Sequence, residues 1–229
     1  MFNDFLERKS NHPASESVVS REDHARGDGR AYLVVKRTVD LAMVMLTAPI
    51  SLPLIGALAL LVRLDGGPAF FGQERLGRDG RIFMLWKLRS MVPDAEARLE
   101  RHLAENPAAK EEWAHAQKLK KDPRVTRLGR FLRKYSLDEL PQLWNVLIGD
   151  MSLVGPRPMF PAQRSLYPGI AYFDLRPGLT GLWQVSERNR TSFAERAHYD
   201  DRYAESVSLG TDLHIIFRTV AVIFRGTGC

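Results

Sequence analysis

The chain has 229 residues, 45% of them hydrophobic, so it is long enough and apolar enough to bury one sizeable core. Its net charge of +6 and pI of about 9.6 favour anionic partners, such as nucleic acid, anionic lipid or phosphorylated small molecules. The single cysteine, Cys229, excludes an internal disulfide, and the sequence has no Cys/His spacing typical of a zinc site.

The first elements of the chain are a polar N-terminus and a long apolar run. Residues 1–30 are polar and charged and show no sustained hydrophobic period, which predicts a mostly disordered segment. Residues 41–62 follow as a run of 22 residues without a charged side chain. A helix of that length is roughly 33 Å long, enough to cross a bilayer core of about 30 Å. A buried core helix is the alternative interpretation.

Two features of the apolar run argue against a simple crossing. Pro49 and Pro53 lie inside it, and each removes a backbone donor and bends a helix. Thr47 and Ser51 are close enough to supply hydroxyls to the freed carbonyls. Basic residues flank the run on both sides, and such flanks prefer the cytoplasm. These features favour a re-entrant helix over residues 31–65, which enters the membrane, bends near Pro49, Ser51 and Pro53, and returns.

Two short strands are expected over residues 69–91. Asp79-Gly80, a strong signal for a hairpin turn, lies between two apolar runs. Lys87 and Arg89 are two positions apart, so on a strand they face the same way. They either contact phosphate or belong to a solvated face.

A charged region follows the hairpin. Residues 93–121 have the pattern of a surface helix that is interrupted at Asn106-Pro107. Residues 118–134 are strongly basic, with apolar residues at helical spacing and arginine or lysine between them. A basic amphipathic helix can bind nucleic acid, lie on anionic lipid or face water. After a membrane segment, the lipid surface is the favoured partner.

Two adjacent carboxylates, Asp138 and Glu139, come directly after this basic segment. Helix capping explains part of the pattern, because Ser136 is a good N-cap residue and Glu139 stands at the third position of a capping box. Capping does not explain Asp138, which a helix N-terminus and a nearby arginine would keep ionised. An ionised aspartate can attack phosphorus, and a neighbouring glutamate can hold Mg²⁺ or handle protons.

Several long motifs occur in one order after residue 30. They read KRTVDLAMVML, FGQERLGRDGRIFMLWKLRSM, SLDELPQLWNVLIGDMSLVGPRP, RPGLTGLWQVSERN and YDDRYAESVSLGTDLHIIFRTV. Together they closely resemble the bacterial sugar transferases that prime surface polysaccharides, the monotopic phosphoglycosyl transferases. The likeness is greatest to the compact members that prime exopolysaccharide synthesis.

The resemblance implies an enzyme that moves a sugar 1-phosphate from a UDP-sugar to undecaprenyl phosphate and releases UMP, with galactose or glucose as the expected sugar. It implies that Asp138 forms a covalent aspartyl-phosphosugar intermediate and that Glu139 is associated with a required Mg²⁺. The family's membrane helix bends at a Ser-Pro pair. Pro53 matches that proline, but Leu52 precedes it and the serine is displaced to Ser51.

Such chemistry brings two phosphates to an anionic nucleophile, so positive charge must gather near it. Arg133 precedes Asp138 by five residues. Proline flanks Arg157 on both sides and follows Arg176, which restricts the backbone and helps to aim each guanidinium at phosphate. Surface ion pairs are the alternative for these arginines. Further candidates for substrate binding are Lys87, Arg89 and Gln184, with Arg188, Asn189 and Arg190 weaker, and Asp150 is either structural or a metal ligand.

The expected fold is α+β and mostly helical, with one re-entrant membrane helix, a small β-hairpin or sheet and amphipathic interfacial helices. The expected order is a disordered N-terminus (1–30), the membrane helix (31–65), a cytoplasmic catalytic domain (66–206) and an amphipathic C-terminal helix (207–229). The expected location is the cytoplasmic face of the bacterial inner membrane. Membrane lipid, the UDP-sugar and undecaprenyl phosphate are the expected partners, without nucleic acid, and a homo-oligomer is left open.

Two other functions stay open on the residues alone. A membrane-anchored adaptor could use residues 118–134 to hold anionic lipid or nucleic acid, and it would need neither an acid pair nor a metal. A membrane-bound phosphatase with an aspartyl nucleophile would release free phosphate or sugar phosphate in place of a lipid product.

Overall fold

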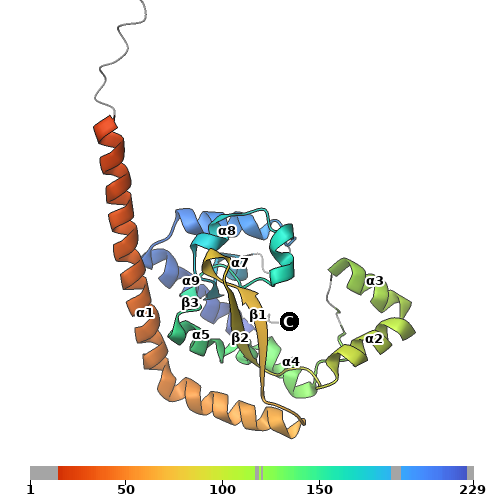
Figure 1. The fold of residues 1–229 in the computed structure, drawn as a ribbon. Helices are drawn as coiled ribbons and strands as arrows, with labels where there is room; N and C mark the ends of the chain where they lie inside the picture. The colour runs from red at the N-terminus through yellow and green to blue at the C-terminus, as the bar shows by residue number, and fades with distance from the viewer. Residues whose placement is uncertain (1–14, 117–118, 120, 187–191, 226–229) are drawn as a thin grey trace, which may run out of the picture. The chain divides into compact units, whose positions relative to one another are not determined.

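The computed structural model describes residues 15–116, 119, 121–186 and 192–225. The chain divides into two compact units, Met1–Val39 and Asp40–Cys229. Residues 40–64 of the long apolar helix belong to the second unit, together with the rest of the chain up to Cys229. The described residues are mostly helical, with two small two-stranded sheets (Figure 1).

Helix α1 (Ser15–Leu64) contains the apolar run. Its segment Tyr32–Leu64 has a hydropathy of 2.1 and is long and apolar enough to cross a membrane by length and composition. The backbone is already helical from Ser15, where the sequence predicts disorder, and residues 1–14 of that prediction lie outside the described residues.

The axis of α1 changes direction in its orange part, around residue 50 (Figure 1). Pro49 and Pro53 lie inside the helix there, and Pro49 has no N–H to donate to the Met45 carbonyl. The Thr47 hydroxyl donates instead to the carbonyls of Met43 (2.8 Å) and Val44 (3.2 Å). The hydroxyl therefore does not bond to the Met45 carbonyl, which Pro49 leaves without its helical donor. This corrects the expected role of Thr47.

The predicted hairpin is confirmed. Strands β1 (Phe70–Leu76) and β2 (Ile82–Leu88) pair antiparallel around the short turn η1 (Arg78–Gly80). Asp79 and Gly80 both have positive φ, 58° and 73°, which is the backbone that an Asp-Gly hairpin turn requires. The register pairs Phe71 with Lys87, so alternate residues of β1 share the face of Lys87.

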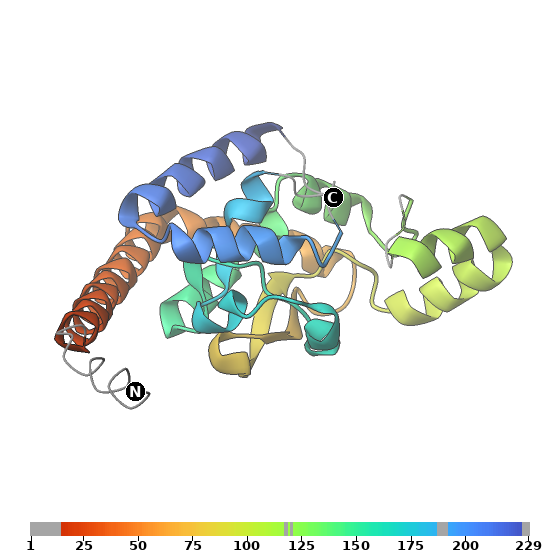
Figure 2. The ribbon, with the colours of Figure 1, turned by 90° about the horizontal axis from the view of Figure 1, so that it is seen from above.

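The helical break at Asn106 is also confirmed. Helices α2 (Ala95–Glu105) and α3 (Pro107–Ala116) pack on each other as a helical hairpin (Figure 2), and α2 buries none of its residues. Helix α4 (Arg127–Lys134) carries the basic segment. It exposes Arg127, Arg130 and Lys134 and fully buries Leu132, as an amphipathic helix should.

The rest of the chain is built from short elements that lie between α4 and the C-terminal helix. Strands β3 (Ser152–Val154) and β4 (Gly178–Thr180) pair in parallel. The other elements are η2 (Leu137–Glu139), α5 (Gln142–Ile148), η3 (Pro161–Leu166), α6 (Ala171–Asp174), α7 (Leu182–Val185), α8 (Arg196–Glu205) and α9 (Leu209–Arg225).

Helix α1 is part of the core, although it is long and apolar enough to cross a membrane. Leu58 and Val62 pack with Leu88 of β2 and Leu132 of α4, while Leu137 and Leu140 lie against the same cluster. Since the last two residues flank the carboxylate pair, the cluster ties the short turn η2 to α1, β2 and α4.

Asn145 fastens α5 to the hairpin. It is fully buried, its Oδ1 accepts from the backbone N–H of Trp86 (3.1 Å), and its Nδ2 donates to the carbonyl of Met84 (2.7 Å). The amide thus supplies hydrogen-bond partners to two backbone groups of β2. This contact sets the distance between the strand that carries Lys87 and the turn that carries Glu139.

Gly129 tests the packing of α4 on the segment after β2. A Cβ at this position would overlap the backbone carbonyl of Ser90, which cannot move without shifting the chain. We expect Gly129→Ala to destabilise the protein by about 1–3 kcal/mol, as overpacking does, and to lower the melting temperature of the detergent-solubilised protein by several degrees. Gly56→Ala on α1 is the matched control, because within 4 Å its added methyl group would meet no atom beyond the neighbouring backbone of its own helix. A Gly129→Ala variant that melts with the wild type would contradict this packing.

Candidate active site

The two carboxylates lie in the one-turn helix η2, between α4 and α5. The turn begins at Ser136, whose φ of 55° is left-handed, a conformation that costs a non-glycine residue on the order of 1–3 kcal/mol. The Ser136 side chain makes no capping hydrogen bond, so the capping box considered from the sequence is not formed. The Glu139 side chain is consequently available for other contacts.

Asp138 and Glu139 line a cavity of about 870 Å³. Its wall carries more cations than anions, which favours a phosphorylated ligand. The cationic residues that line it are Arg75, Lys87, Arg89, Arg124, Arg133 and Arg157.

Glu139 is held by two cations from different elements. Its Oε1 accepts from Lys87 Nζ (2.9 Å), on β2, and from Arg157 Nη2 (3.2 Å), in the loop after β3. All three side chains are less than one third exposed, so solvent screens these ion pairs only in part. The contacts fix the orientation of Glu139 at the edge of the cavity.

Asp138 is 7% exposed. Burial raises the pKa of its carboxyl, Lys87 and Arg133 lower it, and the charge of Glu139 raises it further; the net direction is upward. Desolvation thus outweighs the effect of the helix N-terminus and the nearby arginine on this pKa, because η2 is only one turn long. An ionised carboxylate that water solvates poorly is a good nucleophile once cations stabilise its charge.

Arg133 and Arg89 both reach the cavity, but each also has a structural contact. Arg133 Nε donates to Ser90 Oγ (2.9 Å). Arg89 is buried, and its Nη2 donates to the carbonyl of Val62 (2.9 Å) near the end of α1. Its Nη1 is buried without a hydrogen-bond partner among the described residues. Arg89 therefore links the end of α1 to the cavity and still has a donor to offer.

Sequence reasoning missed Arg75. The guanidinium lies 3.4 Å from the centroid of the Phe160 ring and lines the same cavity. Burial and, after it, the nearby charge of Arg157 together lower the pKa of Arg75 to about 10. Two arginines that repel each other at a cavity wall favour an anion between them. The signal was strand alternation, since Arg75 lies on the face of β1 that Phe71 shares with Lys87.

Two of the predicted residues are not brought to the carboxylate pair. Arg176 and Asp150 line a separate hollow of about 350 Å³, together with Arg78 and Arg81. Asp150 also accepts a hydrogen bond from Asn145 Nδ2 (3.3 Å). The weaker candidates at positions 188–190 lie outside the described residues.

Gln184 lines a third cavity, of about 360 Å³, which is mostly apolar. The side chain is buried, and its Nε2 donates to the carbonyl of Leu179 (3.1 Å). Ser136, Glu139 and Arg157 line both this cavity and the cationic one. The two cavities thus meet at Glu139 and Arg157, and Asp138 lines only the cationic one.

The carboxylate pair fits one kind of metal site. The described residues hold no group of three or more His, Cys, Asp or Glu that could enclose an ion. Mg²⁺ usually binds through one or two carboxylates together with substrate phosphates and water. Glu139, beside Asp138 at the wall of a cationic cavity, is suited to hold an ion that arrives with a phosphorylated substrate.

Comparison with known proteins places the chain in a family. The family model described as bacterial sugar transferase matches residues 31–226. The UDP-galactose-lipid carrier transferase of Erwinia amylovora is 47% identical over 196 residues, which cover 85% of this chain and 41% of that protein. The undecaprenyl-phosphate galactose phosphotransferase of Salmonella typhimurium is 45% identical over 201 residues, 87% of this chain and 42% of that protein.

A shorter relative is covered almost completely. The exopolysaccharide production protein ExoY of Rhizobium meliloti is 44% identical over 202 residues, 85% of this chain and 88% of that protein. The chain thus spans about two fifths of the length of the first two relatives and most of the third. By the match of the family model over residues 31–226 and by these identities, the chain belongs to the bacterial sugar transferase family.

Proposed function

We propose that the protein transfers a sugar 1-phosphate from a UDP-sugar to undecaprenyl phosphate and releases UMP, as a membrane step of exopolysaccharide synthesis. The observation that carries this proposal is the buried Asp138 beside the doubly paired Glu139, at the wall of a cationic cavity. Two relatives are named for undecaprenyl-phosphate galactose and UDP-galactose-lipid carrier transfer, so galactose is the proposed sugar, with glucose as the alternative.

The proposed reaction has two displacements at one phosphorus atom. A carboxylate oxygen of Asp138 attacks the phosphorus attached to the sugar, the bond to the bridging oxygen breaks, and UMP leaves with that electron pair. An oxygen of the lipid phosphate then attacks the same phosphorus and expels Asp138 as a carboxylate. The product is a sugar joined to the lipid through a diphosphate, and the enzyme returns to its starting state.

The residues around the carboxylates suit this chemistry. Arg157 and Lys87 bring positive charge to the place where the leaving and entering phosphates must pass, and Arg133 adds charge near Asp138. Mg²⁺, held by Glu139 and the substrate phosphates, would supply further neutralisation of the leaving group. A membrane adaptor has no use for a desolvated aspartate, and family membership favours transfer over simple phosphate release.

The same proposal includes a re-entrant membrane helix at the cytoplasmic face of the inner membrane. Helix α1 exposes large apolar side chains, among them Ile50 at 75%, and α9 exposes Phe217 and Phe224 at 72% and 83%. Such side chains are expected to contact lipid. The direction change near Pro49, Ser51 and Pro53 and the basic flanks of α1 support entry and return on one side.

The central carboxylate is tested by Asp138→Asn. We expect it to abolish release of UMP and formation of the lipid product, and Glu139→Gln to lower both severely, since neither amide replaces the lost charge. Substantial turnover by Asp138→Asn would contradict its role as nucleophile.

The stability of the same variant provides an independent check. Because the folded pKa of Asp138 is raised, folded protein holds this proton more tightly than unfolded protein. Wild-type stability should therefore fall as the pH rises from the ordinary pKa of aspartate through the folded value. The melting temperature of Asp138→Asn should equal or exceed that of the wild type, with a difference that grows over this pH range. A variant that melts clearly lower at neutral pH would show that Asp138 is a structural residue.

Lysine substitutions compare the two proline-restrained arginines. Lysine cannot reproduce the bidentate fork of arginine. We expect Arg157→Lys to lower kcat/KM by more than about tenfold, which corresponds to roughly 1.4 kcal/mol of transition-state stabilisation. Arg176→Lys should have a much smaller effect, because Arg176 lines a separate hollow. If Arg176→Lys lowered kcat/KM as much as Arg157→Lys does, Arg176 would have to belong to the phosphate site as well.

Single cysteines test the topology. In a Cys229→Ser background, cysteines at Ser15 and at Ala108 should both be shielded from a membrane-impermeant thiol reagent in spheroplasts and should both react after permeabilisation. Labelling at position 15 alone before permeabilisation would show that α1 spans the membrane. Pro53→Leu then tests the bend: exposure of position 15 in part of the population would assign the bend to Pro53.

A further inference from the structure

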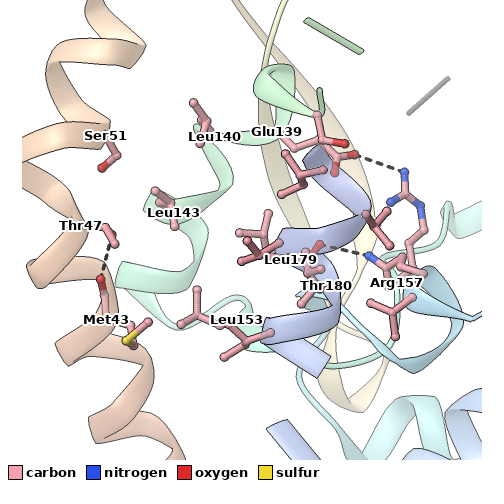
Figure 3. Close-up of a pocket in the computed structure, with 18 residues that line it drawn as sticks. Met43, Thr47, Ser51, Glu139, Leu140, Leu143, Leu153, Arg157, Leu179 and Thr180 are labelled. Carbon is pink, nitrogen blue, oxygen red and sulfur yellow. Dashed lines mark hydrogen bonds and ion pairs between the residues drawn. The ribbon is translucent and has the colours of Figure 1, made fainter. Parts of the chain in front are cut away.

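The apolar cavity that shares Glu139 and Arg157 with the cationic one has walls from both α1 and α9. It lies between α1, the segment from η2 to α5, the segment from β4 to α7, and α9. In Figure 3, Met43, Thr47 and Ser51 line it from α1, Leu140 and Leu143 lie between, and Glu139 and Arg157 stand at the far side, joined by an ion pair.

Most polar groups of this wall are bonded within the protein. The Thr47 hydroxyl donates to the Met43 carbonyl (2.8 Å), and the hydroxyls of Thr180 and Thr219 are 2.6 Å apart. Thr219 also donates to the Ile215 carbonyl (2.8 Å). The wall therefore presents methyl and methylene groups to an occupant, with Gln184 Oε1 as a buried oxygen that has no partner among the described residues.

The lining of the cavity changes from apolar to charged at one end. Glu139 and Arg157 stand there, and they also line the cationic cavity. A nucleotide sugar carries phosphates and hydroxyls throughout and suits only the cationic side. A molecule with one phosphate and a long apolar chain suits the junction, since its phosphate can meet Arg157 while its chain lies among leucines.

We propose that this cavity holds the first part of the apolar chain of the lipid phosphate acceptor, next to its phosphate; this rests on the function proposed above. At about 360 Å³ the cavity can hold only a short piece of a long chain. The remainder leaves between α1 and α9, whose outer faces expose large apolar side chains, and continues into lipid. Donor and acceptor thus reach one carboxylate pair from two sides.

The test separates the donor and acceptor halves of the reaction. Val220 lines the cavity from α9 and is 47% exposed, so a larger side chain there can enter the cavity with little disturbance of the core. We expect Val220→Trp to raise the KM for undecaprenyl phosphate at least tenfold, with an unchanged burst of UMP when UDP-galactose or UDP-glucose is supplied without lipid. Leu213→Trp is the matched control, because Leu213 lies on the same helix, is 48% exposed and does not line the cavity.

If Val220→Trp does not fold, a second measurement on the wild-type protein tests the same proposal. A prenyl phosphate with a photoreactive diazirine on its first isoprene unit should label the wild-type protein on α1 near Met43–Ser51 or near Leu140–Leu143. An unchanged acceptor KM in Val220→Trp, or label confined to residues outside the cavity wall, would overturn the proposal. A wild-type protein that neither releases UMP nor forms lipid product would overturn the proposed function itself, which is seen before any variant is compared.

Discussion

The ion pairs of Glu139 with Lys87 and Arg157 are the contacts on which the site depends. They join the hairpin, the turn η2 and the loop after β3 at one carboxylate, and they do so where solvent screens them only in part. Asp138 is buried next to them, which is unfavourable for its charged form. The cations that offset this cost are also the groups that a phosphate ester needs, which is why the proposed substrate suits this site.

The apolar residues of α1 support the site by packing against the elements that carry it. Leu58 and Val62 pack against β2 and α4, and Arg89 ties the end of the helix to the cationic cavity through the Val62 carbonyl. Asp40 of the same helix accepts a hydrogen bond from the backbone of Leu153 in β3 (3.1 Å). A helix that is long and apolar enough for a membrane is thus built into the core of the catalytic unit.

Local signals were readable from the sequence, while long-range contacts were not. Asp79-Gly80 and Asn106-Pro107 act through the backbone of their own neighbours, and the structure has the turn and the break where they predict. The capping box failed because Ser136 is left-handed and Glu139 binds cations from β2 and the loop after β3. The cavity that Arg75 lines and the separate hollow at Arg176 depend on how distant segments pack, which spacing alone does not encode.

The claim that one aspartate serves both substrates in turn has a direct measurement: isotope exchange between labelled UMP and the UDP-sugar with no lipid phosphate present. A covalent intermediate on Asp138 predicts that the wild-type protein moves label from UMP into UDP-sugar, and that Asp138→Asn does not. Full transfer of sugar phosphate to the lipid by a protein that shows no such exchange would contradict it, because the phosphoryl group would then pass directly from donor to acceptor.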